Sequence, residues 1–148
     1  MKKILTILIV GLLNFSSNAL SDDEILNSLK EGKKLVFIRH AIAPGNGDPV
    51  NFNIRDCSTQ RNLDKNGIKQ SKKIGLFFEK NKIKIDKVLS SEWCRCKDTA
   101  KYAFKKFETF NALNSFYDQR LAANETKQIN DLKKYIENWN GDKNLVFV

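Results

Sequence analysis

The sequence is poor in metal ligands and in long apolar runs. It contains a single histidine, His40, and only three cysteines among its 148 residues. A structural zinc site needs several cysteine and histidine ligands at characteristic spacings, which Cys94, Cys96 and a distant histidine do not provide. The longest apolar run, residues 4–13, is about half the ~20 residues that a membrane-spanning helix requires. We therefore expect neither a metal site nor a stable membrane anchor.

The N-terminal segment has the pattern of a secretory signal peptide. Lys2 and Lys3 precede the apolar run, and small residues, Ser17 and Ala19, follow it. This pattern predicts cleavage after Ala19, with export to the periplasm and a single mature domain over residues 20–148. A buried N-terminal helix is the alternative interpretation.

Export would place the cysteines in an oxidising compartment, where disulfides form. One disulfide is expected, with one thiol left over. Cys57 is predicted to pair with either Cys94 or Cys96, since a bridge between Cys94 and Cys96 would be strained.

Arginine is scarce in a strongly basic chain. The net charge is +9, which suits nucleic acid, an anionic membrane or a phosphorylated molecule. The lysines are dispersed over predicted helical faces, and no aromatic stacking platform is evident, so nucleic acid is the least favoured partner. Only five of the 26 basic residues are arginines: Arg39, Arg55, Arg61, Arg95 and Arg120. Arginine provides a planar fork for phosphate that lysine lacks, so each arginine is a candidate ligand-binding residue.

Hydrophobic periodicity predicts alternating helices and strands. Helices are expected over 21–32, 64–81, 95–107 and 125–139, and strands over 34–39, 85–90 and 144–148, with a further strand or extended segment at 109–113. Residues 41–60 and the stretch from 115 to 124 are expected to be loops. The order predicts an α/β domain with a mostly parallel central sheet flanked by helices on both faces. The continuous apolar run at 34–39 predicts a central strand.

Polar residues follow two of these predicted strands. Arg39 and His40 end the first strand, and Arg95 opens the helix after the second, where helix N-terminal N–H groups also favour an anion. Ligands gather at the carboxyl ends of parallel strands, so these residues predict a phosphate pocket. A neutral histidine in such a pocket can attack phosphorus while the arginines withdraw charge from the phosphoryl oxygens.

At these residues the chain resembles the histidine phosphatase superfamily, which includes the cofactor-dependent phosphoglycerate mutases and many phosphatases. The resemblance covers nearly the whole mature chain. It rests on three ordered motifs, "VFIRHA", "RNLDKNGIKQSKKIG" and "VLSSEWCRCKDTA". The segments "APGNGDP", "DCSTQRNL" and "LNSFYDQR" further resemble a bacterial exported branch of the superfamily.

The resemblance implies roles for individual residues. His40 would be the nucleophile that becomes phosphorylated, and Arg39 and Arg95 would bind the phosphoryl group. Arg61 either lines the pocket or pairs with an acid such as Asp56, and Asp118 is a candidate general acid. The expected substrate is a phosphorylated small molecule or a phosphoprotein, with no cofactor and no metal.

The chain departs from the family after its last predicted strand. Family members carry a second catalytic histidine directly after a late strand of the type "LVFV", whereas this sequence ends at Val148 and has no second histidine. The resemblance therefore implies a domain that is incomplete at its C-terminus. Three hypotheses follow: an exported phosphatase, an inactive relative that only binds phosphate-containing ligands, and, least favoured, a basic nucleic-acid-binding domain.

Overall fold

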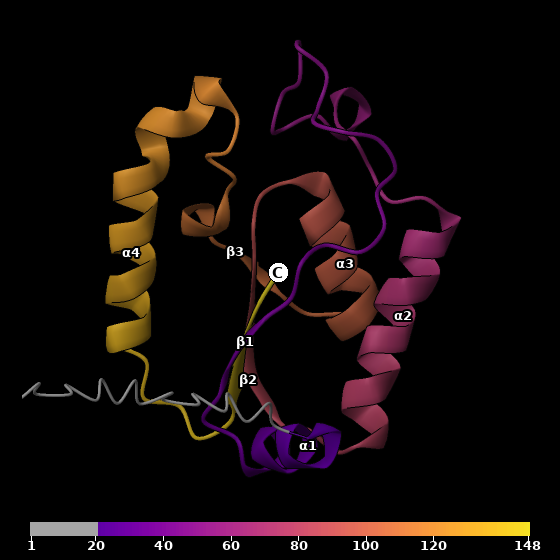
Figure 1. Cartoon of the computed structure of the whole chain (residues 1–148), viewed down its shortest axis with the longest axis vertical. Helices are drawn as coiled ribbons and strands as arrows, with labels where there is room; N and C mark the ends of the chain where they lie inside the picture. Colours follow the sequence, from indigo (N-terminus) through magenta and orange to yellow (C-terminus); the bar gives the residue numbers. More distant parts are fainter. Residues whose placement is uncertain (1–20) are drawn as a thin grey trace, which may run out of the picture.

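The computed structural model describes residues 21–148, so the predicted signal peptide lies outside the described residues. The chain folds as an α/β domain around a four-stranded sheet of order β1-β4-β2-β3 in which all pairings are parallel (Figure 1). The strands are β1 (Leu35–Phe37), β2 (Ile85–Ser90), β3 (Glu108–Thr109) and β4 (Asn144–Phe147). The four α-helices of the described residues are α1 (Asp22–Glu31), α2 (Lys65–Lys80), α3 (Cys94–Phe104) and α4 (Glu125–Glu137).

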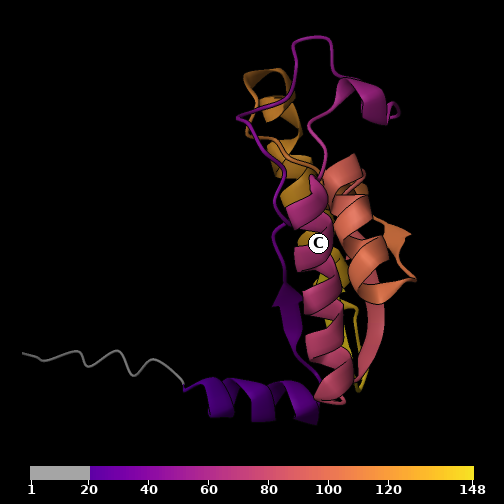
Figure 2. The same cartoon turned by 90° about the vertical axis from the view of Figure 1, so that its right-hand side faces the viewer.

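Helices cover both faces of the sheet, as the sequence predicted. On one face, side chains of α1, α2 and α3 form a core with the buried Val88 of β2 and Val146 of β4. On the other face, α4 packs on a smaller cluster of Leu89, Leu145 and Phe147. Figure 1 shows α4 apart from the α2–α3 pair, with the sheet between them, and Figure 2 views the molecule from the side of α2 and α3.

Local sequence signals set most of the helix boundaries. Ser21 caps α1 in a capping box with Glu24, and Gly32 ends the helix with a positive φ of 87°. The Asp64 side chain accepts a hydrogen bond from the backbone N–H of Gly67 and begins α2. Helix α3 ends at Phe104 rather than at the predicted residue 107, because the next residue, Lys105, has a φ of 66°.

The prediction that residues 34–39 form a central strand is wrong. Strand β1 lies at an edge of the sheet, and Leu35 and Phe37 are 38% and 60% exposed. Val36 and Ile38 pack against the core beneath α2 and α3. The opposite side of the strand is left open, because α4 packs over β2 and β4 and not over Leu35. The fully buried central strand is β4 instead.

The segment between α3 and α4 is more irregular than the sequence predicted. The expected strand at 109–113 is only the two-residue β3, followed by a short 3-10 helix at Asn111–Leu113. A second 3-10 helix, Gln119–Asn124, occupies the predicted loop before α4. No helix within residues 21–148 is both long enough and apolar enough to span a bilayer.

Candidate functional site

A cavity of about 850 Å³ lies where the carboxyl ends of the parallel strands meet. Its walls come from the end of β1, the 45–48 loop, the start of α3, the 113–119 segment and the end of β4. The site residues predicted from the sequence all line it: Arg39, His40, Arg61, Arg95 and Asp118. Segments that are distant in sequence therefore supply a single site.

His40 is held in a defined orientation by its own neighbour. The Nδ1 atom of His40 lies 2.8 Å from the carbonyl oxygen of Ala41. A carbonyl oxygen only accepts hydrogen bonds, so the neutral imidazole carries its proton on Nδ1 and its lone pair on Nε2. Within the described residues, Nε2 has no hydrogen-bond partner. This is the arrangement that a nitrogen nucleophile requires.

Helix α3 fixes the backbone that carries this histidine. The buried Thr99 hydroxyl accepts a hydrogen bond from the backbone N–H of Ala41 at 2.9 Å and donates one to the carbonyl oxygen of Arg95. The N–H of Ala41 is thus hydrogen-bonded to α3, and its carbonyl oxygen is hydrogen-bonded to the His40 imidazole. These two hydrogen bonds of the Thr99 hydroxyl explain the threonine of the motif at residues 99–100.

The surroundings of His40 favour the neutral imidazole. Burial lowers the pKa of His40 from the ordinary 6.5, and the positive charges of Arg95, Arg61 and Arg39 lower it further. The hydrogen bond to Ala41 acts in the opposite direction without reversing the shift. The free Nε2 lone pair is therefore retained at neutral pH.

Arg95 is a buried cation with a fixed plane. Its guanidinium Nη1 donates to both carboxylate oxygens of Asp48, at 3.0 and 2.9 Å. The guanidinium carbon lies 4.7 Å from the centre of the Trp93 ring, which supports one face. Both partners of the ion pair are almost fully buried, with side-chain exposures of 9% for Arg95 and 7% for Asp48.

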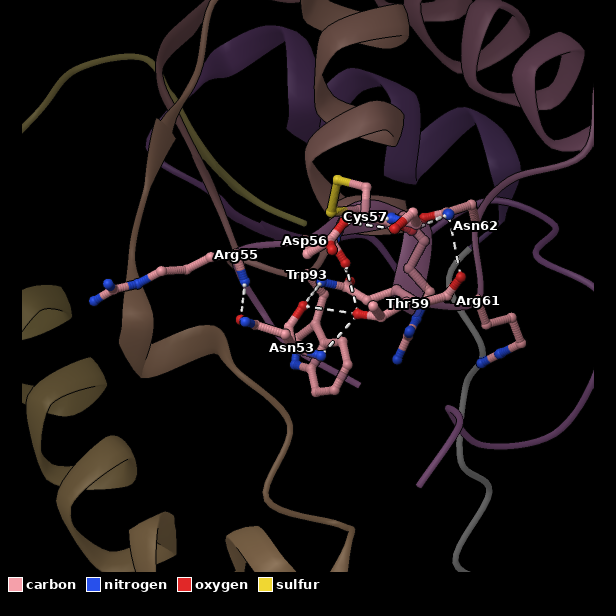
Figure 3. The surroundings of a disulfide bond; sticks show 12 residues. Asn53, Arg55, Asp56, Cys57, Thr59, Arg61, Asn62 and Trp93 are labelled. Atoms are coloured by element: carbon pink, nitrogen blue, oxygen red, sulfur yellow. Dashed lines mark hydrogen bonds between the residues drawn. A yellow bond between two sulfur atoms is a disulfide. The ribbon is translucent and has the colours of Figure 1, made fainter. Parts of the chain in front are cut away.

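Arg61 lies in the cavity and is not paired with Asp56. Its Nη1 donates to the carbonyl oxygens of Ala43 and Gly45. The Asp56 carboxylate instead accepts hydrogen bonds from the backbone N–H and hydroxyl of Ser58. Figure 3 shows the Arg61 side chain directed away from Asp56. The proposed Arg61–Asp56 ion pair is therefore wrong, and Arg61 belongs to the pocket.

Arg39 lines the same cavity and is exposed. No ion pair or hydrogen bond of its guanidinium occurs among residues 21–148, in contrast to Arg61 and Arg95. Its charge is therefore available to an anionic ligand that enters from solvent.

Asp118 is held as a carboxylate. It accepts hydrogen bonds from Nε and Nη2 of Arg120, at 2.8 and 2.5 Å, and also caps the 3-10 helix that follows. These hydrogen bonds from Arg120 lower the pKa of Asp118 to about 2. A group ionised at neutral pH is a poor proton donor, so this pairing disfavours the general-acid role that the resemblance implied.

A disulfide joins the long loop to the start of α3. Cys57 is bonded to Cys94 (Figure 3), one of the two pairings left open by the sequence. Cys96 is a buried free thiol. Burial raises the pKa of the Cys96 thiol, which keeps it protonated. Next to the disulfide, the side-chain oxygen of Gln60 accepts the backbone N–H of Cys94. These contacts join the segment that precedes Arg61 to the start of α3, which carries Arg95.

Asp48 is the principal site residue that no sequence pattern indicated. It lies in the aperiodic 41–60 segment, where its burial against Arg95 has no local signal. The predicted length of this loop was the only indication of a functional role.

The described residues hold no group of three or more histidine, cysteine, aspartate or glutamate side chains arranged to bind a metal ion. Comparison with known proteins adds no assignment, since the chain matches no family model and no curated protein.

Proposed function

We propose that this protein is an exported phosphatase of the histidine phosphatase superfamily. It hydrolyses a phosphomonoester or a phosphohistidine through a phosphohistidine intermediate on His40. The observation that carries this proposal is the neutral His40 imidazole, with Nδ1 bonded to Ala41 and Nε2 unpartnered, in one cavity with Arg39, Arg61 and Arg95.

The chemistry has two steps. In the first, Nε2 of His40 attacks phosphorus and the bond from phosphorus to the leaving-group oxygen or nitrogen breaks, with the leaving group taking a proton from water. In the second, water attacks phosphorus, the phosphorus–nitrogen bond breaks, and inorganic phosphate leaves with neutral His40 restored. The arginines stabilise the negative charge on the transferring group in both steps.

A protein that binds phosphate without turnover is the second candidate. Asp48 and Asp118, the two carboxylates that line the cavity, are both paired with arginines. A carboxylate paired in this way does not readily donate a proton to a departing alkoxide. This candidate predicts phosphate binding at the arginines with no product release from any monoester.

The two candidates are separated by hydrolysis of p-nitrophenyl phosphate, whose leaving group departs without a proton donor. We expect turnover by the wild-type chain and loss of activity to the uncatalysed background in His40→Ala. Asp56→Asn is the matched control, because Asp56 is an exposed carboxylate that contacts Ser58 and does not line the cavity. Equal rates for the wild type and His40→Ala would remove His40 from the reaction.

A further inference from the structure

The loop of residues 43–48 holds two arginines of the cavity in the same way. It contacts Arg95 through the Asp48 carboxylate and Arg61 through the carbonyl oxygens of Ala43 and Gly45. In both arginines the contacted atom is Nη1. The loop therefore accepts hydrogen bonds from one terminal nitrogen of each guanidinium and from no other atom of the group.

The opposite edge of each guanidinium has no partner within the described residues. The Nε atoms of Arg61 and Arg95 are both buried without a hydrogen-bond acceptor, and no hydrogen bond involves Nη2 of either residue. A buried unpaired donor is costly, and at two arginines that line one cavity a bound anion would satisfy both donors. The Nε–Nη2 edge is also a planar fork that can give two parallel hydrogen bonds to phosphate oxygens.

Asp48 connects the two arginines. Its Oδ1 accepts a hydrogen bond from the backbone N–H of Arg61 at 2.8 Å and another from Nη1 of Arg95. The stacking of Arg95 on Trp93 fixes the guanidinium plane, and Asp48 fixes its rotation within that plane. A single buried carboxylate thus sets the position of one guanidinium and of the backbone that carries the other.

We propose that Asp48 is a positioning residue that keeps the Nε–Nη2 edges of Arg95 and Arg61 free for one phosphoryl group. The identity of the anion rests on the proposed function. Asp48 itself makes no contact with the reacting atoms and acts through the arginines. It also offsets part of the repulsion among the cavity cations while the cavity is empty.

The direct test is calorimetric titration of the full chain with inorganic phosphate. Asp48→Asn retains an oxygen acceptor for Arg61 but loses the charge that pairs with Arg95, so we expect phosphate binding to weaken by about ten-fold. Asp56→Asn is the control and should bind as the wild type does. Unchanged binding in Asp48→Asn would overturn the proposal. Tighter binding would also overturn it, because Asp48 would then be a competitor for Arg95.

A double-mutant cycle tests whether Asp48 acts through Arg95. In an Arg95→Lys background, which lacks the planar fork, Asp48→Asn should weaken phosphate binding little further. A full additional loss in that background would indicate a general structural role and would overturn the proposal.

Gly45→Ala gives a second route if Asp48→Asn does not fold. Gly45 has a φ of +96°, and an added Cβ would lie 3.4 Å from Cδ of Arg61. This substitution disturbs the support of Arg61 while leaving the Asp48 carboxylate in place, and we expect weaker phosphate binding. Wild-type affinity in Gly45→Ala would contradict the role assigned to the loop.

The two proposals fail in different ways. If the wild type binds phosphate, Asp48→Asn binds it more weakly and neither chain turns over p-nitrophenyl phosphate, the phosphatase activity is refuted and the positioning role of Asp48 stands. If the wild type turns over substrate and Asp48→Asn binds phosphate equally well, only the positioning role is refuted.

Discussion

The Nδ1 atom of His40 donates a hydrogen bond to the carbonyl oxygen of Ala41, 2.8 Å away, and the N–H of Ala41 donates one to the hydroxyl of Thr99 in α3. The tautomer of the imidazole is therefore set by backbone that a neighbouring helix restrains. Removal of Thr99 or displacement of α3 would disturb the nucleophile without touching the histidine itself.

The ionisation of His40 can be measured directly, because it is the only histidine in the chain. Nitrogen-15 NMR of the imidazole should show a proton on Nδ1 at neutral pH and a titration midpoint below the ordinary 6.5. The pKa is lowered because burial and the positive charges of Arg95, Arg61 and Arg39 all disfavour the imidazolium. Arg95→Gln removes one of these charges and should raise the midpoint. A midpoint above 6.5, or an Nε2–H tautomer, would contradict the account.

The Cys57–Cys94 disulfide should stabilise both the fold and the site. The bond closes a loop with a sequence separation of 37 residues. In the chain-entropy description, a loop of this size contributes about 4 kcal/mol to the free energy of unfolding. We expect Cys57→Ser to lower the free energy of unfolding by about this amount in denaturant titrations.

Cys96→Ala is the control for this experiment, because Cys96 is a free thiol. Intact mass measured without reductant should show the disulfide retained in Cys96→Ala and absent in Cys94→Ala. Retention of a disulfide in Cys94→Ala would indicate that Cys57 pairs with Cys96 instead.

Asn144 should be among the polar residues on which stability depends most. Its fully buried side chain accepts the backbone N–H of Lys34 and donates to the carbonyl oxygens of Leu29 and Lys84. Asn144→Ala removes all three side-chain hydrogen bonds, although the carbonyl oxygen of Lys84 keeps the backbone N–H of residue 144, and should lower the free energy of unfolding by about 2–3 kcal/mol. The exposed Asn140→Ala should change it by less than about 0.5 kcal/mol. Similar thermal denaturation of the two variants would contradict this role of Asn144.

The sequence predicted those features that depend on local signals. Ser21 and Asp64 cap helices because of chemistry within one turn, and the predicted strand 85–90 coincides with β2. The meeting of His40 and Arg95 was also predictable, because the carboxyl ends of parallel strands share one edge of the sheet.

Features that depend on distant contacts were not predictable. The apolar run at 34–39 does not reveal that β4 lies between β1 and β2 and leaves β1 at the edge. Asp48 appears as one polar residue of an aperiodic loop, and its burial depends on Arg95, 47 residues away. Asn144 is polar at the start of an apolar strand, and only contacts with three separate segments explain its burial.

The most direct test of the central claim is to trap the phosphorylated enzyme. Wild-type chain mixed with excess p-nitrophenyl phosphate and quenched in alkali, where phosphohistidine survives, would be digested and analysed by mass spectrometry. We expect one phosphoryl group on the peptide that contains His40, lost on acid treatment and absent from His40→Ala. Turnover of substrate with no phosphoryl group on His40, or with the group on another residue, would contradict it.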